Sequence, residues 1–346
     1  MNSTVTRFDW RKNVLLFGLT VWSVFATGRN YAASDNVNGA AGPWYTGWAF
    51  ALPLLLILLA HEFGHYVAAR VHRVPASLPY FLPLPPAVGS PFGTLGAIIL
   101  MPGRIRSARA LLDIGAAGPL AGMVVALPTM VIGLKLSHVG PQISGNFMQE
   151  GQSLLYILIK HLVLGPIPPT HDVFLHPTAF AAWAGFFVTF LNLLPFMQLD
   201  GGHVAYALFG HKHDAWSRRA WWVPAAMIIV NAWTHGWSIG RAAWPQVVGR
   251  YHAAVEAGTD PGIWVRRRQA LSKAWAAFSD APWSPAISSL SLWFTLLVLL
   301  LVFRRLSSGV HPPVDEPELG RGRRVVAVGT LLLAVLLFMP SPLVAY

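Results

Sequence analysis

Residues 61–65, His-Glu-Phe-Gly-His, carry the side chains of this chain that are best suited to do chemistry. His61 and His65 are four residues apart, so on a helix they lie on one face, about 6 Å apart along the axis. Two imidazoles at this spacing can bind one zinc ion, and Glu62 can then act as the general base beside a metal-bound water. The pattern H-E-x-x-H therefore predicts a zinc site on a helix.

The residues before this motif support the prediction. No charged residue lies between Trp44 and Ala60. Two imidazoles and a carboxylate in an apolar helix of lipid-spanning length are costly unless something compensates them. A divalent metal ion supplies that compensation, so we expect His61 and His65 to share one.

A catalytic zinc ion takes three protein ligands and keeps one position for water. Only three of the 14 acidic residues lie inside hydrophobic segments, and these are Glu62, Asp113 and Asp200. Asp200 lies between Pro195 and the pair Gly201-Gly202, which interrupt the helical hydrogen-bond ladder. Such a break lets a carboxylate turn toward the centre of a helix bundle. Asp200 is therefore the predicted third ligand.

Other assignments remain open for the polar residues near this break. The carboxylate could instead cap the broken helix, and His203 is a rival third ligand, although it follows two glycines. His211 and His213 flank a lysine at the expected membrane edge and are predicted to be solvated loop residues. Asp113 lies four residues after Arg109, so we interpret it as part of a structural ion pair or cap.

The composition indicates a polytopic membrane protein. The 346 residues are 54% hydrophobic and 11% charged, whereas roughly a quarter of the residues of a soluble domain are charged. Without cysteine, the chain has no disulfides and must bind zinc through nitrogen and oxygen. The net charge of +11 fits Lys and Arg flanking membrane segments, so we expect a lipid bilayer and no nucleic acid as partner. No cleavable signal peptide is predicted.

The predicted fold class is an all-α polytopic membrane protein with about seven transmembrane segments around a three-helix catalytic core. Length and charge-free runs place the segments at about 13–28, 44–71, 108–134, 178–209, 219–239, 285–303 and 324–343. We divide the chain into an N-terminal segment with the first helix (1–43), a catalytic membrane core (44–210), and C-terminal membrane helices with an interfacial loop at 240–284 (211–346).

The segment 74–103 is apolar but rich in proline and glycine. Its backbone cannot face lipid without hydrogen-bond partners, so we expect a re-entrant loop packed on protein. Its end, from Gly93 to Met101, reads as a short strand. Residues 151–164 could form a short surface helix.

The distribution of Lys and Arg predicts the orientation. With the N-terminus in the cytoplasm, 16 of the 25 Lys and Arg residues lie on the cytoplasmic side, and six of the other nine lie in 240–284. His61 then lies about 13 Å and Asp200 about 18 Å from the cytoplasmic edge, counted as helix. The predicted ligands can therefore meet at a similar depth.

Two motifs together resemble the site-2 protease family of intramembrane zinc metalloproteases. That family carries H-E-x-x-H on one core helix, as at 61–65 here, and N-x-x-P-x-x-x-L-D-G on another, as at 192–201. Residues 92–122 and 311–317 also resemble its bacterial and chloroplast-type branch. The resemblance covers most of residues 44–210 and the C-terminal tail, and implies a branch without PDZ or CBS domains.

The resemblance also implies roles for individual residues. His61, His65 and Asp200 would hold a single Zn²⁺, and Glu62 would be the general base. Asn192 would hold the substrate backbone or the oxyanion. The strand around Thr94, Leu95 and Gly96 would pair with an unwound substrate segment, and the small residues of 117–122 would allow close helix packing. Gly122 stands where many members have asparagine, so it receives no polar role.

The sequence thus predicts a zinc metalloendopeptidase that cleaves a membrane-anchored, single-pass protein in or near its transmembrane segment, in regulated intramembrane proteolysis. The expected location is a bacterial inner membrane. Two rival functions use the same ligands: a divalent-metal transporter or sensor, and a catalytically silent scaffold. The apolar outer half of segment 44–71 offers no metal path, and the presence of Glu62 with all three ligands argues against a silent relative.

Overall fold

The computed structural model describes residues 10–34, 43–88, 90–101, 105–142, 148–196, 198–219, 222–234, 293–294, 297–298, 301, 305, 314–341 and 343–345. The chain divides into two compact units. The first comprises residues 1–143, 153–219 and 307–339, and the second comprises 144–152, 220–306 and 340–346. The part of the chain described here is mostly helical, as predicted.

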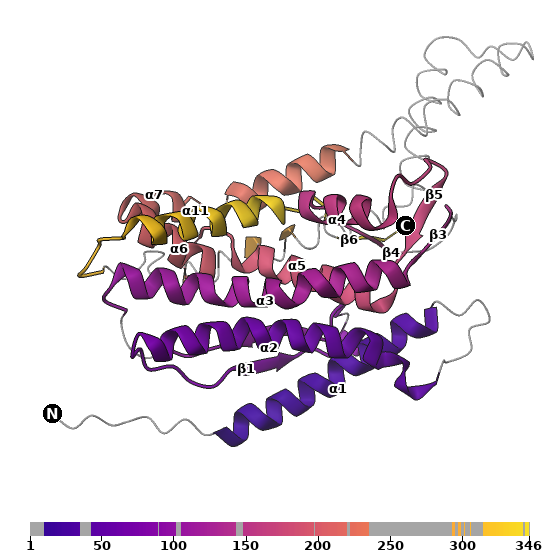
Figure 1. Ribbon diagram of the computed structural model, residues 1–346, viewed down its shortest axis with the longest axis horizontal. Coiled ribbons are helices and arrows are strands. Elements are labelled where there is room, and N and C mark those ends of the chain that lie inside the picture. The colour runs from indigo at the N-terminus through magenta and orange to yellow at the C-terminus, as the bar shows by residue number, and fades with distance from the viewer. Residues whose placement is uncertain are drawn as a thin grey trace, which may run out of the picture. The chain divides into compact units, whose positions relative to one another are not determined.

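Three helices form the centre of the first unit. They are α2 (Trp48–Val71), which follows the short 3-10 helix η1 (Trp44–Gly47), α3 (Ala108–Leu136) and α5 (Pro177–Asn192). Each of the three packs against the other two, and α2 and α3 run side by side (Figure 1). Each of the three helices buries apolar side chains almost fully, for example Leu54, Leu112 and Phe186.

Two helices of the described chain are long and apolar enough to cross a membrane, judged by length and composition: Trp44–Val71 and Ala108–Leu136. They match two of the predicted segments within two residues at each end. The segment predicted at 178–209 is divided into α5 and α6 (Asp200–Phe209). The predicted loop 240–284 and most of the segment 285–303 lie outside the described residues, and the total of about seven spans stays a prediction.

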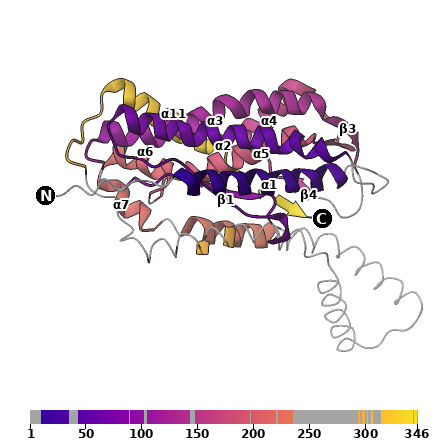
Figure 2. The same cartoon turned by 90° about the horizontal axis from the view of Figure 1, so that it is seen from below.

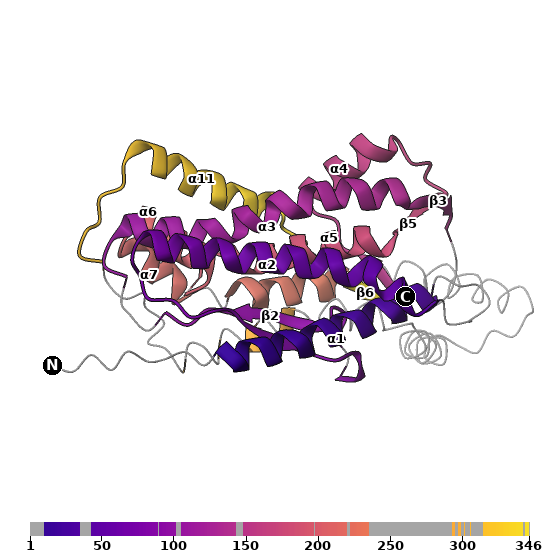
Figure 3. The ribbon, with the colours of Figure 1, turned by 60° about the horizontal axis from the view of Figure 1, so that its bottom comes forward.

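The proline-rich segment after α2 forms a small antiparallel sheet. Its strands are β1 (Tyr80–Pro83) and β2 (Thr94–Ile98), with the 3-10 helix η2 (Pro86–Val88) between them. Tyr80 pairs with Ile98, and the register shifts by a bulge before Pro83 pairs with Thr94. Figure 2 shows β1 against α1 (Trp10–Ser34), and Figure 3 shows β2 between α1 and α2.

Polar side chains of α1 satisfy the backbone of this segment. Asn13 donates its amide to the carbonyls of residues 78 and 79, Ser23 donates to that of Gly93 at 2.6 Å, and Tyr31 donates to that of Pro91. Phe92 packs its ring 5.9 Å from the ring of Phe187 on α5. The expectation that this apolar, irregular segment packs on protein is therefore confirmed.

Shorter elements lie around this centre. In the first unit, β3 (His138–Pro141) pairs with β5 (His171–Phe174), α4 (Leu154–Leu164) packs on α3, and α7 (Lys212–Ser217) follows α6. In the second unit, β4 (Met148–Glu150) pairs with β6 (Leu343–Ala345), and residues 222–234 are helical. The helix at 151–164 was predicted, whereas these four strands were not.

The helix α11 (Arg321–Leu336) packs against α3 and α6, although more than a hundred residues separate it from either. Before it, the chain runs beside the start of α3, where the carbonyl of Glu316 accepts the N–H of Ala108 at 2.9 Å. The carbonyl of Glu318 accepts the side chain of Arg109 at 3.4 Å. The chain segment that precedes α11 is thus hydrogen-bonded to the first turn of α3.

The ion pair of Asp113 was predicted with the wrong partner. Arg323 of α11 donates to both carboxylate oxygens of Asp113, at 2.8–3.1 Å. His72, at the end of α2, lies 2.8 Å from the same carboxylate. Arg109 instead donates to the carbonyl of Glu318. The prediction was wrong because the i,i+4 spacing reports only on neighbours within one helix, whereas Arg323 follows Asp113 by 210 residues. The interpretation of Asp113 as structural fits this geometry.

Replacement of Arg323 by methionine should weaken the packing of α11. The variant loses the two-pronged donation to Asp113 but keeps most of the apolar stem, so we expect the free energy of unfolding to fall by about 1–3 kcal/mol. Arg324→Met is the control, since its side chain is exposed, and it should change the free energy by less than about 0.5 kcal/mol. Chemical denaturation in detergent micelles measures both, and equal stability of the two variants would contradict the role of the ion pair.

Candidate metal centre

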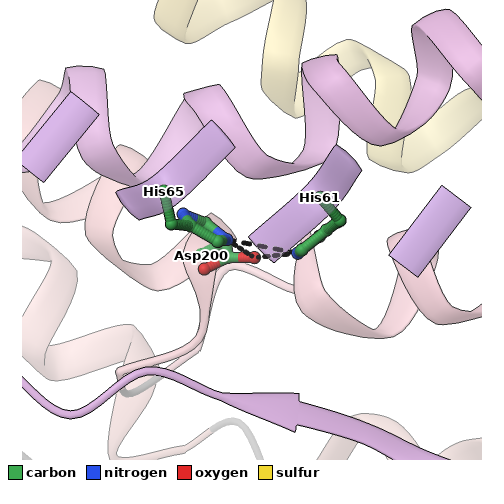
Figure 4. Close-up of side chains that lie close together, drawn as sticks. All are labelled: His61, His65 and Asp200. Atoms are coloured by element: carbon green, nitrogen blue, oxygen red, sulfur yellow. Dashed lines mark hydrogen bonds and ion pairs between the residues drawn. The ribbon is translucent and has the colours of Figure 1, made fainter. Parts of the chain in front are cut away.

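The helix α2 carries the H-E-x-x-H residues on its buried side. His61, Glu62 and His65 are 3%, 6% and 8% exposed. The four-residue spacing turns both imidazoles toward α3 and the start of α6 (Figure 4). The sequence prediction of two histidines on one buried helical face is therefore confirmed.

A break between α5 and α6 brings the third group. The helix α5 ends at Asn192 and α6 starts at Asp200, and residues 193–196, 198 and 199 are the described part of the chain between them. A Cβ atom at Gly201 would overlap the carbonyl oxygen of Leu193, so this position requires glycine. The predicted interruption at Pro195 and Gly201 is present, and it presents Asp200 in the first turn of a new helix.

Three atoms that could bind one metal ion meet at one point. The Nε2 atoms of His61 and His65 are 3.2 Å apart, and each lies 3.2 Å from Oδ2 of Asp200. Figure 4 shows these side chains converging, and within the described residues they are the one group of three His, Cys, Asp or Glu side chains placed to hold a metal ion. Ligands at about 2.0–2.1 Å from a tetrahedral zinc ion are about 3.3–3.4 Å apart. The observed triangle matches one face of that tetrahedron.

The protonation state also favours a cation at this point. His65 lies with Nδ1 2.7 Å from the carbonyl oxygen of Ile114, and a carbonyl only accepts, so Nδ1 carries the proton. In the neutral ring, which a metal ligand requires, the Nε2 atom of His65 then presents its lone pair toward the carboxylate oxygen of Asp200. Lone pairs that face each other in a buried site repel unless a cation lies between them. The donor set of two imidazoles and one carboxylate is one that catalytic zinc sites use.

The helix α3 forms the wall behind the two histidines. A Cβ atom at Gly118 would overlap the imidazole of His65, so the ring lies directly over the backbone of α3. Gly122 lies beside His61 at the next turn, where a Cβ atom would come within 3.3 Å of the histidine Cβ. The prediction that the small residues of 117–122 allow close packing is confirmed, and Gly122 indeed offers no polar group.

Two further predicted site residues lie close to the ligands. The amide nitrogen of Asn192 is 3.2 Å from Nε2 of His61, so it borders the position that a metal ion would take. Glu62 interacts electrostatically with His61, His65 and Asp200. Both residues therefore belong to the immediate surroundings of the triangle.

The three residues predicted to bind substrate lie in β2, which contacts α2. Thr94 is buried and accepts the N–H of Gly96 at 3.0 Å, whereas Leu95 is exposed. Among the described residues the sheet has two strands, so there β2 pairs with β1 along one edge. None of the three residues contributes to the metal triangle.

The histidines after the break have different positions. His203 lies one turn beyond Asp200, beside Gly115, and is not part of the triangle. His211 is 81% exposed, as predicted for a loop residue. The prediction for His213 was wrong: it is fully buried, and its Nε2 lies 3.0 Å from the carbonyl oxygen of Pro195. The ring is buried because α7 packs against the break between α5 and α6, and no local sequence pattern predicts this tertiary contact.

Comparison with known sequences places this geometry in a family. The model of Peptidase family M50 matches residues 49–230, which is more than half of the 346 residues. The chain belongs to peptidase family M50. The matched residues of this M50 chain include the H-E-x-x-H motif, Asn192 and Asp200.

Curated relatives agree with this assignment. "Probable zinc metalloprotease EGY1, chloroplastic" of Arabidopsis thaliana is 36% identical over 171 residues, 46% of this chain and 30% of the relative. "Probable zinc metalloprotease EGY2, chloroplastic" of Arabidopsis thaliana is 31% identical over 166 residues, 47% of this chain and 29% of the relative. The M50 chain thus spans about 30% of the length of these relatives. No solved structure matches the chain.

Substitution of Gly118 by alanine should displace His65 and weaken metal binding. The new methyl group and the imidazole cannot occupy the same space, and we expect zinc affinity to fall by about 10- to 100-fold. Gly329→Ala is the control, because the same change on α11 meets no atom within 4 Å. Chelator competition on the purified protein measures the affinities. Native zinc affinity in Gly118→Ala would contradict the placement of His65.

Proposed function

We propose that this M50 chain is an intramembrane zinc metalloendopeptidase that hydrolyses a peptide bond in or near the transmembrane segment of a membrane-anchored protein. The observation that carries the proposal is the triangle of His61, His65 and Asp200, with edges of 3.2 Å. Both histidines of the triangle lie on a helix that is long and apolar enough to cross a membrane. Burying these polar side chains in an apolar surrounding costs free energy unless a bound cation compensates them, and such residues in membrane segments are usually functional.

The side chains around the triangle supply the functions that hydrolysis requires. A zinc ion held by His61, His65 and Asp200 would polarise the scissile carbonyl and lower the pKa of water toward about 7. Glu62 takes the proton of the attacking water and then gives it to the leaving amine. Glu62 is buried near both histidines and not solvated at the surface, which is consistent with this role. The amide of Asn192 donates to the substrate backbone or to the developing oxyanion.

A helical substrate hides its peptide carbonyls, so it must unwind before cleavage. We propose that the unwound segment adds to β2 at Thr94, Leu95 and Gly96, where main-chain hydrogen bonds would hold it extended. The contact of β2 with the metal-bearing helix α2 supports this location. The substrate class that fits is a single-pass membrane protein, cleaved in regulated intramembrane proteolysis.

Isosteric removal of the base tests the mechanism. Glu62→Gln should retain zinc, because the ligands are intact, and should lose cleavage by about 10²- to 10⁴-fold, because the proton acceptor is gone. Glu318→Gln makes the same change at an exposed carboxylate and should leave cleavage unchanged. The measurement is cleavage of co-expressed single-pass membrane proteins, with zinc content by elemental analysis. Full cleavage by zinc-loaded Glu62→Gln protein would refute the proposed role.

We also propose that the chain resides in a bacterial inner membrane with its N-terminus in the cytoplasm. The excess of Lys and Arg near the end of α2 and the start of α3 supports this orientation. Water would then reach the metal centre from the cytoplasmic side.

Cysteine labelling tests the orientation, since the chain has no cysteine of its own. Arg106 and Lys135 lie near opposite ends of α3 and are both exposed. In right-side-out bacterial spheroplasts, an impermeant thiol reagent should label Lys135→Cys and should spare Arg106→Cys until the membrane is opened. The reverse pattern would invert the orientation and leave the metal ligands unaffected.

A further inference from the structure

His213 is a buried side chain that the proposed mechanism does not use. It lies on α7, 13 residues after Asp200, and has no exposed surface. Its ring meets the ring of Tyr206 edge to face, with centroids 6.0 Å apart. Tyr206 is itself 1% exposed and lies on α6, the helix that starts with Asp200. His213 thus contacts the helix that carries the predicted third ligand.

His213 also contacts the turn that precedes this helix. Its Nε2 lies 3.0 Å from the carbonyl oxygen of Pro195 and donates a hydrogen bond to it. In a continuous helix this carbonyl would accept the N–H of Leu199, but Leu199 donates to the carbonyl of Phe196 instead. The imidazole therefore replaces a helical hydrogen bond at the break.

The second ring nitrogen of His213, Nδ1, makes no hydrogen bond to the described residues in its buried position. Nδ1 is buried and has no hydrogen-bond partner among the described residues, which costs about 1–3 kcal/mol. Burial lowers the pKa of His213, so the neutral ring carries its single proton on Nε2. An apolar side chain would fill the same space without this cost, so the bond to Pro195 is the property that distinguishes histidine here.

The turn held by His213 joins two groups of the metal centre. The amide nitrogen of Asn192 and Oδ2 of Asp200 stand on either side of the turn, and each lies 3.2 Å from Nε2 of His61. On one side the turn is fixed by Gly201, which packs directly on the carbonyl of Leu193. His213 fixes the other side through Pro195.

We propose that His213 is a positioning residue for the metal centre: its hydrogen bond to Pro195 sets the turn between α5 and α6, so that Asp200 and Asn192 both reach the metal position beside His61. This inference rests on the proposed zinc function and adds to it a residue that touches neither metal nor substrate.

The experiment compares substitutions that keep or remove the donor. His213→Leu fills the site without a donor, and His213→Gln places an amide N–H at nearly the reach of Nε2. Zinc affinity is measured by chelator competition on the metal-free protein, and the visible absorption of the cobalt(II)-loaded protein reports ligand geometry. We expect His213→Leu to bind zinc about tenfold more weakly, with an altered cobalt spectrum, and His213→Gln to restore most of the loss. His211→Leu, at the exposed neighbour, should match the native protein.

Native zinc affinity and cobalt spectrum in His213→Leu would overturn the proposal. So would a lower unfolding temperature of the metal-free protein with an unchanged spectrum, since that result describes a purely structural ring. If His213→Leu does not fold, His213→Asn and His213→Gln decide, because the shorter amide cannot reach Pro195; equal zinc affinities of these two would overturn it. If the native protein binds zinc but cleaves no membrane protein, that result counts against the peptidase function alone. The zinc affinities of the His213 variants would still decide the role of His213.

Discussion

The structure depends on the convergence of three atoms that can bind a metal ion in an apolar helical surrounding. Two imidazole nitrogens and a carboxylate oxygen, each 3.2 Å from the others, need a proton or a metal ion between them in this buried surrounding. The neighbouring features serve this arrangement. Ile114 fixes the tautomer of His65, Gly118 makes room for its ring, and the break at Pro195 turns Asp200 inward.

The local part of this arrangement could be predicted from the sequence. The spacing of His61 and His65 defines a helical face, and the charge-free residues before them indicate an apolar helix in which such a face needs a compensating cation. Asp200 could be found because proline and paired glycines mark a helix break, and because acids are rare in apolar segments. The bounds of the two candidate spans, Trp44–Val71 and Ala108–Leu136, were predicted within two residues from the same apolar runs.

The remaining features depend on contacts between distant segments, which leave no periodic trace. The partner of Asp113 is Arg323 and not the neighbouring Arg109. His213 looked like a solvated residue beside Lys212, yet the return of α7 buries it on the break. The hydrogen bond from His65 to the carbonyl of Ile114 could not be predicted from the sequence, since every residue offers the same backbone carbonyl. The strands β3 to β6 were missed because they are only three or four residues long.

The hydrogen bonds between α11 and the start of α3 also set an order of events during synthesis. The ribosome completes α2 and α3 long before Arg323, which follows Asp113 by 210 residues. Until those residues have been added, the carboxylate of Asp113 has only His72 beside it, and the backbone of Ala108 lacks its acceptor on Glu316. Domains generally fold from the N-terminus as they are made, but the bonds that tie the start of α3 to the candidate metal centre's outer helix α11 can form only after that helix has emerged.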